Sequence, residues 1–223
     1  MREVGNLMIQ IIPSLASADP LNLKGCLDSL GSISQVHLDI EDGNFVPNIT
    51  FGLKTALAVR ACTSRLLDAH LLVTRPMDYL EPLLSAGFQA IAIHVESEAY
   101  PGEALLRIRR GGAKAGLAFN GKANIDMALA YADDLDYVII MTSEPDGRGQ
   151  QLNPHLLDKI RFARNRLPER IAITADGGIG ADNLAEVVQA GADSLILGRA
   201  VWSAEYPEDA CRRFLHQANG VRA

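Results

Sequence analysis

The sequence lacks long apolar runs and clusters of basic residues. Nothing in its 223 residues approaches the roughly 18 continuous apolar residues that a membrane span needs, so we expect no membrane insertion. Lysine and arginine total 21 against 27 acidic residues, which gives a net charge of -6, and the basic residues are scattered. A nucleic-acid surface needs a basic patch, and we therefore expect no nucleic-acid partner.

Cysteine is scarce as well. The three cysteines, Cys26, Cys62 and Cys211, lie far apart and form no C-x-x-C pair, which predicts free thiols in a reducing compartment rather than a disulfide framework. The short apolar patch near the start is interrupted by Gln10 and Pro13, so it suits a first strand better than a signal peptide. We predict a cytoplasmic protein.

Short aliphatic or β-branched runs alternate with longer helical patterns, and Gly, Pro and Asn separate them. This alternation is typical of repeated βα units, and we count eight. The predicted strands begin near Ile9, Gln35, Leu66, Ala90, Ala113, Tyr137, Ile171 and Ser194, and the predicted helices begin near Pro20, Leu53, Pro76, Gly102, Asn124, Pro154, Asn183 and Pro207.

Eight consecutive units favour an α/β fold, a closed (β/α)8 TIM barrel formed as a single domain by residues 1–223. The pairs Ala86-Gly87 and Ala190-Gly191 each lead within a few residues into a predicted strand, as turns at helix ends do. An open doubly wound sheet is the alternative. It is disfavoured because no G-x-G-x-x-G follows the first predicted strand.

Barrel enzymes build their active sites at the carboxyl ends of the strands. In the second predicted strand, alternation places His37, Asp39 and Glu41 on one face, and alternate Cα atoms lie about 6.6 Å apart. His70 and Asp176, at other strand ends, could complete a metal site with His37 and Asp39. Such a mixed set suits zinc, iron, manganese or cobalt without selecting one. The alternative is that the same groups hydrogen-bond across the barrel mouth without an ion.

Glycines follow the last three predicted strands, in the segments EPDGRGQ from Glu144, DGGIG from Asp176 and GRA from Gly198. Backbone N–H groups of such loops commonly hold a phosphate in barrels. A single glycine is a weak signal because any turn can use one, but their joint placement indicates a phosphate site.

Six motifs together resemble the ribulose-phosphate 3-epimerase family, in the same order and over about Ile11 to Trp202. They are PSLASAD from Pro13, HLDIEDGNFVPNITFG from His37, DAHLLVTRPMDYL from Asp68, IHVE from Ile93, MTSEPDGRGQ from Met141 and ADGGI from Ala175. The resemblance implies an isomerase of the ribulose-phosphate-binding barrel type that binds one divalent metal ion. Such an epimerase inverts the carbon beside the keto group of a phosphorylated ketose, either ribulose 5-phosphate or a related pentulose or hexulose phosphate.

The resemblance also implies roles for individual residues. Asp39 and Asp176 would be the acid/base pair, and His37, Asp39, His70 and Asp176 would be the metal ligands. The implied substrate contacts are Ser14, His70, Met141, Asp146, Gly147, Arg148, Gly149, Gly177, Gly178, Gly198 and Arg199. We further expect self-association into a homo-oligomer, as is common for such barrels.

Two alternatives remain open for the activity. One is a sugar-phosphate-binding paralogue with weak or no catalysis. The other is a decarboxylase or aldolase of a related barrel, which would need an Asp-x-Lys-x-x-Asp array or a Schiff-base lysine. Ile40 or Glu41 stands at the lysine position, so the second alternative is disfavoured.

The sequence departs from the family pattern at the expected pocket. Glu41 and Leu72 stand where the family usually has methionine, and Met141 alone keeps the polarisable apolar side chain. A carboxylate at position 41 would disfavour negative charge on the substrate, so we hypothesise that Glu41 binds a hydroxyl of a different sugar or pairs with a cation. Arg148 and Arg199 replace small residues in the phosphate loops and could hold a phosphate, or could point into solvent.

Two neighbouring segments carry further expectations. We predict that His94 and Glu96 line the pocket or brace His70 rather than bind a metal. The segment that contains Asn44, Phe45 and Asn48 is predicted to close over the metal end, although a structural turn would explain it nearly as well.

Overall fold

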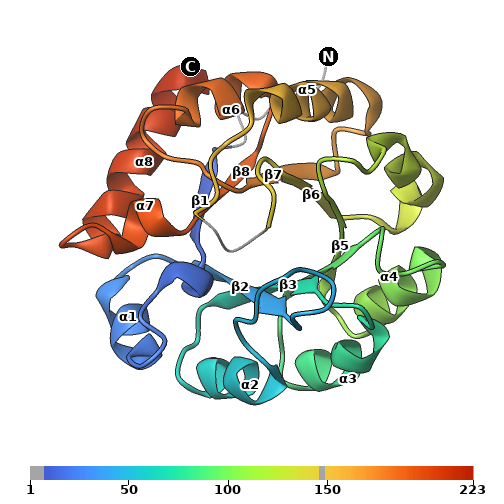
Figure 1. The fold of residues 1–223 in the computed structure, drawn as a ribbon, viewed down its shortest axis with the longest axis horizontal. Coiled ribbons are helices and arrows are strands. Elements are labelled where there is room, and N and C mark those ends of the chain that lie inside the picture. The colour runs from blue at the N-terminus through green and yellow to red at the C-terminus, as the bar shows by residue number, and fades with distance from the viewer. Residues whose placement is uncertain (1–7, 146–148, 223) are drawn as a thin grey trace.

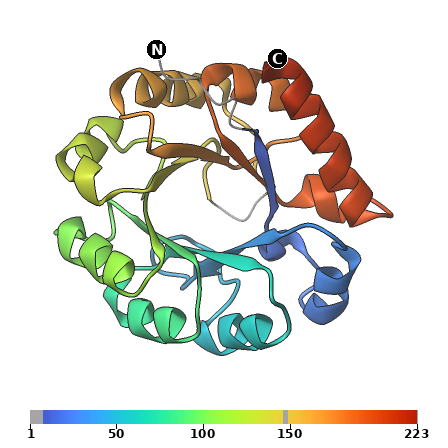
Figure 2. The same ribbon diagram turned by 180° about the vertical axis from the view of Figure 1, so that it is seen from behind.

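A computed structural model describes residues 8–145 and 149–222, and shows a ring of eight parallel strands with helices around its outside (Figure 1; seen from behind in Figure 2). The strands are β1 (Gln10–Pro13), β2 (Gln35–Glu41), β3 (Leu66–Leu72), β4 (Ala90–His94), β5 (Lys114–Phe119), β6 (Tyr137–Met141), β7 (Ala172–Asp176) and β8 (Ser194–Leu197).

Most of the helices lie in the connections between successive strands. The α-helices are α1 (Leu23–Ser29), α2 (Leu53–Ala61), α3 (Met77–Ser85), α4 (Pro101–Arg110), α5 (Leu157–Arg166), α6 (Leu184–Ala190), α7 (Arg199–Trp202) and α8 (Pro207–Arg222), and the 3-10 helices are η1 (Leu15–Ser17), η2 (Ile125–Asp134) and η3 (Pro154–Leu156). None of the described helices is both long and apolar enough to cross a membrane.

Strand pairing follows the chain order around the ring. Each of β2 to β7 pairs with the strand that follows it, β8 pairs with β1, and a parallel bridge between Ser14 and His37 links β1 to β2. All eight predicted strands are present within a few residues of their expected starts, so the TIM-barrel prediction is confirmed.

Two layers of buried side chains follow from strand alternation. Outward side chains such as Leu38 and Ile40 of β2 belong to the large apolar core that includes helix residues such as Leu80 and Leu105. Inward side chains fill the barrel, and the apolar ones form a separate cluster of Ile12, Ala90, Ala92, Ala118, Tyr137, Ile139, Met141 and Ile196. Buried polar side chains, among them those of β2 and β3, lie in the interior as well.

The helix predictions need three corrections. The first helix begins at Leu23 rather than near Pro20, because the Asn22 side chain accepts the N–H of Gly25 and caps it. The segment after Asn124 is a 3-10 helix, η2, not an α-helix. Helix α7 was not predicted, since four residues are too few to show a helical period.

Tyr137 depends on a glycine for its place inside the barrel. Gly116 of β5 is its partner in the parallel register, and a Cβ at Gly116 would lie 2.5 Å from the tyrosine ring. We therefore expect Gly116→Ala to lower the free energy of unfolding by about 1–3 kcal/mol through overpacking. Urea unfolding measures this change.

Gly220→Ala is the matched control, because a Cβ there meets nothing within 4 Å and the residue lies inside α8. Alanine is the better helix former, so this variant should be as stable as the unaltered protein or more so. Equal unfolding midpoints for Gly116→Ala and Gly220→Ala would contradict the packing argument.

Candidate active site

The register between β2 and β3 places polar residues side by side inside the barrel. His37 lies opposite Asp68, Asp39 opposite His70, and Glu41 opposite Leu72. Because alternate residues of a strand share a face, these three pairs form successive levels toward the carboxyl ends of the strands. β7 adds Asp176, its last residue.

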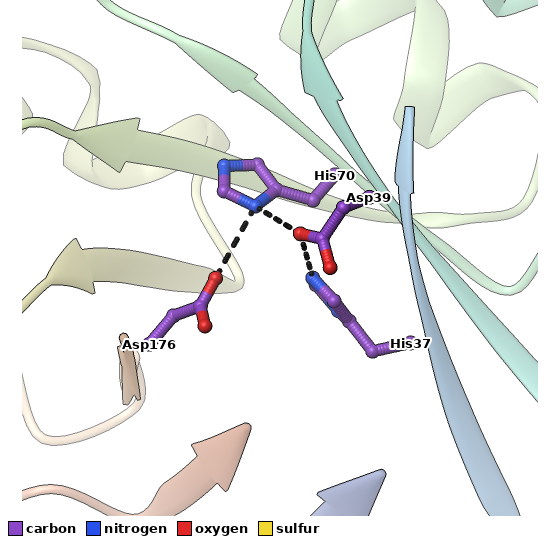
Figure 3. Close-up of side chains that lie close together, drawn as sticks. All are labelled: His37, Asp39, His70 and Asp176. Carbon is purple, nitrogen blue, oxygen red and sulfur yellow. Dashed lines mark hydrogen bonds and ion pairs between the residues drawn. The ribbon is translucent and has the colours of Figure 1, made fainter. Parts of the chain in front are cut away.

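Four side chains from the lower two levels and from the end of β7 converge in a cluster of His37, Asp39, His70 and Asp176, which we call the His/Asp cluster (Figure 3). His37 Nε2 and His70 Nδ1 lie 3.1 and 3.2 Å from Asp39 Oδ1, and His70 Nδ1 lies 3.5 Å from Asp176 Oδ2. The histidine side chains are fully buried, and those of Asp39 and Asp176 are 12% and 13% exposed. The two carboxylates therefore remain the accessible part of the cluster.

The close charges shift the pKa values of the cluster. Burial alone would lower the pKa of His37, but the carboxylates of Asp39 and Asp68 raise it well above its usual value. Burial would raise the pKa of Asp39, but His37 and His70 hold it well below its usual value. Burial and the neighbouring Asp39 carboxylate raise the pKa of Asp176.

The cluster fits a divalent metal ion. Each of its residues can offer one ligand atom, and these atoms all lie within 4.8 Å of one another. Two imidazole nitrogens and two carboxylate oxygens are a donor set found with zinc and other first-row ions. The structure thus brings the four predicted ligand residues together, and the donor set does not select a metal.

Each histidine of the cluster has a partner on its other ring nitrogen. His37 Nδ1 lies 2.9 Å from Asp68 Oδ2, and His70 Nε2 lies 2.9 Å from His94 Nε2. His94 Nδ1 in turn faces Glu96 at 3.3 Å. His94 thus braces His70, one of the two roles expected of it, and burial lowers the pKa of His94 to about 4.

A cavity of about 370 Å³ lies above the cluster. Asp39 and Asp176 contribute to its lining, whereas His37 and His70 do not. Its other lining residues include the predicted contacts Ser14, Met141, Gly149, Gly177, Gly178, Gly198 and Arg199, and the specificity candidates Glu41 and Leu72.

Glycines line the cavity beside the ends of β7 and β8, where neighbouring groups approach the backbone closely. Gly177 and Gly178 have φ of 118° and 69°, a region that favours glycine. A Cβ at Gly178 would clash with the backbone of Gln151 and Leu152, and one at Gly198 with the Ser17 side chain. Gly149 also has a positive φ, while the predicted contacts Asp146, Gly147 and Arg148 lie outside the described residues.

Arg199 follows this glycine-lined region as the first residue of α7. It lines the cavity while remaining solvent-exposed, and its Nη2 donates to the carbonyl of Gln150. Its guanidinium therefore lies beside the loop after β6 rather than free in solvent.

Glu41 occupies the level above Asp39 and is 7% exposed. Its Oε2 accepts a hydrogen bond from Asn48 Nδ2 at 2.6 Å. Burial and the Asp39 carboxylate raise the pKa of Glu41 to about 7. Asn48 belongs to the segment that was predicted to close over this end, and Phe45 of the same segment packs against the His94 ring with centroids 4.9 Å apart.

Sequence reasoning missed two residues around the cluster. Asp68 lies two positions before His70, so the alternation that was applied to His37 and Asp39 could have found it. Tyr137 donates to Asp68 Oδ1 at 2.9 Å from β6, and no local pattern relates these two strands. Asn48 was assigned to the closing segment, but its bond to Glu41 was not expected.

The fold and the site define the class of protein: a (β/α)8 barrel with a mixed histidine and carboxylate cluster at the carboxyl ends of its strands, where barrel enzymes place their active sites. The model of the Ribulose-phosphate 3 epimerase family matches residues 10–202.

Named relatives agree with this match over nearly the whole chain. Ribulose-phosphate 3-epimerase 2 of Cupriavidus necator is 35% identical over 94% of this chain and 90% of its own length. The ribulose-phosphate 3-epimerase of Bacillus subtilis is 33% identical over 87% of this chain and 93% of its own. The chain belongs to the ribulose-phosphate 3-epimerase family. This confirms the predicted enzyme class, an epimerase among the isomerases.

Solved structures of lower identity share the fold. 3-Hexulose-6-phosphate synthase from Salmonella typhimurium has a TM-score of 0.73 at 12% identity and covers 96% of this chain and 100% of its own. Orotidine 5'-phosphate decarboxylase from Pyrococcus horikoshii has a TM-score of 0.68 at 20% identity and covers 95% and 100%. At these identities the likeness concerns the barrel alone.

The His/Asp cluster leads to a stoichiometric prediction. We expect one equivalent of Zn²⁺ or Co²⁺ to bind per chain, and we expect His70→Ala to abolish stoichiometric binding because it removes an imidazole ligand. Elemental analysis after gel filtration measures the bound metal. His155→Ala is the control, since His155 is exposed on η3. Full binding by His70→Ala would exclude this cluster as the metal centre.

Proposed function

We propose that this chain is a metal-dependent 3-epimerase of a ketose phosphate, acting on ribulose 5-phosphate and xylulose 5-phosphate or on a related pentulose or hexulose phosphate. The observation that carries the proposal is the pair of carboxylates, Asp39 and Asp176, which reach one cavity from β2 and β7. Family membership and the names of the relatives support the reaction class.

His37, Asp39, His70 and Asp176 would hold the metal ion. When bound, the divalent ion supplies Lewis acidity that makes a proton beside a carbonyl easier to remove, an effect worth several kcal/mol. The buried imidazoles hold one side of the cluster rigidly, and the accessible carboxylate edges face the cavity.

Asp39 and Asp176 would transfer the proton. Their strands are separated in the ring by β1 and β8, so their carboxylates approach a bound substrate from different directions. One removes the proton and the other returns a proton to the opposite face of the planar intermediate. Ser14 Oγ donates to Asp39 Oδ2 at 2.5 Å, and His70 contacts its other oxygen. These contacts hold Asp39 in position for the transfer.

The phosphate would bind beside the last two strands. Gly177, Gly178 and Gly198 line the cavity there with backbone that carries no side chain, and Arg199 adds a positive charge at the same rim. Guanidinium groups hold phosphate well because their donors match its oxygens. Together these features support a phosphorylated substrate whose sugar carbons lie over the two carboxylates.

Solvent deuterium exchange tests the reaction directly. Metal-loaded protein in D₂O should exchange the proton beside the keto group of a ketose phosphate, monitored by NMR over a panel of pentulose and hexulose phosphates. We expect Asp39→Asn and Asp176→Asn each to slow exchange by at least ~10²-fold, the usual contribution of a general acid or base.

Asp158→Asn is the matched control for these variants, because Asp158 is an exposed carboxylate on α5, away from the cavity. It should exchange at the unaltered rate. If the panel binds but none of its members exchanges, the alternative of a sugar-phosphate-binding paralogue is favoured over the epimerase.

We also propose that Glu41 and Leu72 set the substrate preference. Glu41 brings a third carboxylate to the lining that contains Asp39 and Asp176, and Asn48 holds it by a hydrogen bond. A carboxylate in that position suits a substrate hydroxyl that can donate to it. Leu72, opposite Glu41 in the register, presents an apolar wall.

Replacing Glu41 by methionine should therefore change the preference among ketose phosphates. We expect the ratio of kcat/KM for ribulose 5-phosphate to that for the best hexulose phosphate to rise about tenfold. A hydrogen bond to a charged group is worth about 1.5–3 kcal/mol, which is enough for such a change. Asp158→Asn, which changes an exposed carboxylate on α5 away from the cavity, is the control and should leave the ratio unchanged. No change of the ratio in Glu41→Met would remove Glu41 as a determinant.

A decarboxylase or aldolase remains disfavoured by the site. Ile40 faces the helices and Glu41 faces the cavity, so no lysine lies at this part of β2. Likeness to an orotidine 5'-phosphate decarboxylase concerns the barrel alone. The cytoplasmic location, the single domain and self-association stay predictions from the sequence.

A further inference from the structure

The tautomer of His37 is set by a residue outside the His/Asp cluster. His37 Nδ1 lies 2.9 Å from Asp68 Oδ2, and a carboxylate can only accept, so Nδ1 carries the hydrogen. Nε2 lies 3.1 Å from Asp39 Oδ1 and is the atom that would bind the metal ion. A metal-bound imidazole is neutral and has one hydrogen, which Asp68 would hold on Nδ1.

Asp68 is itself held in place from across the barrel. It is 2% exposed, and its second oxygen accepts the Tyr137 hydroxyl at 2.9 Å. Tyr137 stands on β6, three strands away from β3 in the sheet order. Its ring fits because the partner in the register on β5 is Gly116. Gly116, Tyr137 and Asp68 thus form a continuous series of contacts that ends at His37.

We propose that Asp68, oriented by Tyr137, is a positioning residue for the metal site and tunes the affinity of His37 for the ion. The inference rests on the proposed metal centre and assigns residues outside its ligand set. A carboxylate on the remote imidazole nitrogen fixes the ring orientation and raises the basicity of the ligating nitrogen. Loss of such a partner typically weakens metal binding by about 10–100-fold.

The test is metal affinity rather than activity. Zn²⁺ and Co²⁺ dissociation constants are measured by competition with a chromogenic chelator for the unaltered protein, Asp68→Asn and Tyr137→Phe. We expect Zn²⁺ affinity to fall at least ~10-fold in Asp68→Asn and by a smaller factor in Tyr137→Phe. The visible spectrum of bound Co²⁺ should also shift in Asp68→Asn, because the ligand field of His37 changes.

Two controls separate this role from a general loss of stability. Asp136→Asn makes the same chemical change at a carboxylate that accepts the Ala115 N–H at 2.8 Å, whereas the carboxylates that face His37 in the described structure are Asp39 and Asp68. Ser194→Ala removes a buried hydroxyl at the start of β8, where it donates to the Gln10 side chain. Both should keep the unaltered metal affinity even where they lower the urea midpoint.

The outcomes distinguish this inference from the proposed function. Equal affinities in Asp68→Asn and the unaltered protein would overturn the positioning role and leave the metal centre intact. No binding by the unaltered protein would overturn both. If Asp68→Asn does not fold, Tyr137→Phe decides, because it removes one hydroxyl and keeps the ring. Unchanged affinity in that variant would overturn the role of the Asp68–Tyr137 pair.

Discussion

The parallel register of β2 against β3 is the constraint on which the site depends. It sets His37 beside Asp68 and Asp39 beside His70 within one hydrogen-bonded ladder. Because side chains alternate with a period of two, a slip of one residue in either strand would turn its polar set toward the helices and its apolar set into the barrel. The large apolar core outside the strands, which contains Leu38 and Ile40, opposes that slip. Hydrophobic packing on the outward face of β2 therefore determines which polar side chains of this strand point into the barrel.

Burying four titratable side chains together is costly unless each finds a partner. The hydrogen bonds of Asp39 show how this cost is offset. One oxygen contacts both His37 and His70, and the other accepts from Ser14. Because Ser14 also bridges to His37 where β1 meets β2, the residue that links these two strands also fixes the carboxylate. The helices behind the strands contribute no side chain to these bonds, so the site is built from the strands and their immediate ends.

The sequence predicts much of this arrangement, and physical reasons explain the remainder. Alternation alone places His37 and Asp39 together, and the order of the βα units predicts the barrel. The position of His70 depends on β3 pairing directly with β2, and that of Asp176 depends on closure of the ring, which brings β7 near β2. The bond between Tyr137 and Asp68 could not be predicted, since it crosses the interior and depends on the room left by Gly116. The 3-10 form of η2 carries no signal in the apolar spacing used to predict helices.

The three levels of the interior differ in how many bonds restrain them. At the lowest level, Asp68 bonds both His37 and Tyr137, and at the middle level Asp39 bonds three side chains. At the top level Glu41 lies opposite Leu72 and accepts a hydrogen bond from Asn48, and both side chains line the cavity. A substitution at the lower two levels breaks a buried hydrogen-bond network, whereas a substitution at the top level mainly changes which ligands fit the cavity. Under the proposed function, this gradient would let one barrel keep Asp39 in place while the side chains above it adapt to a different sugar.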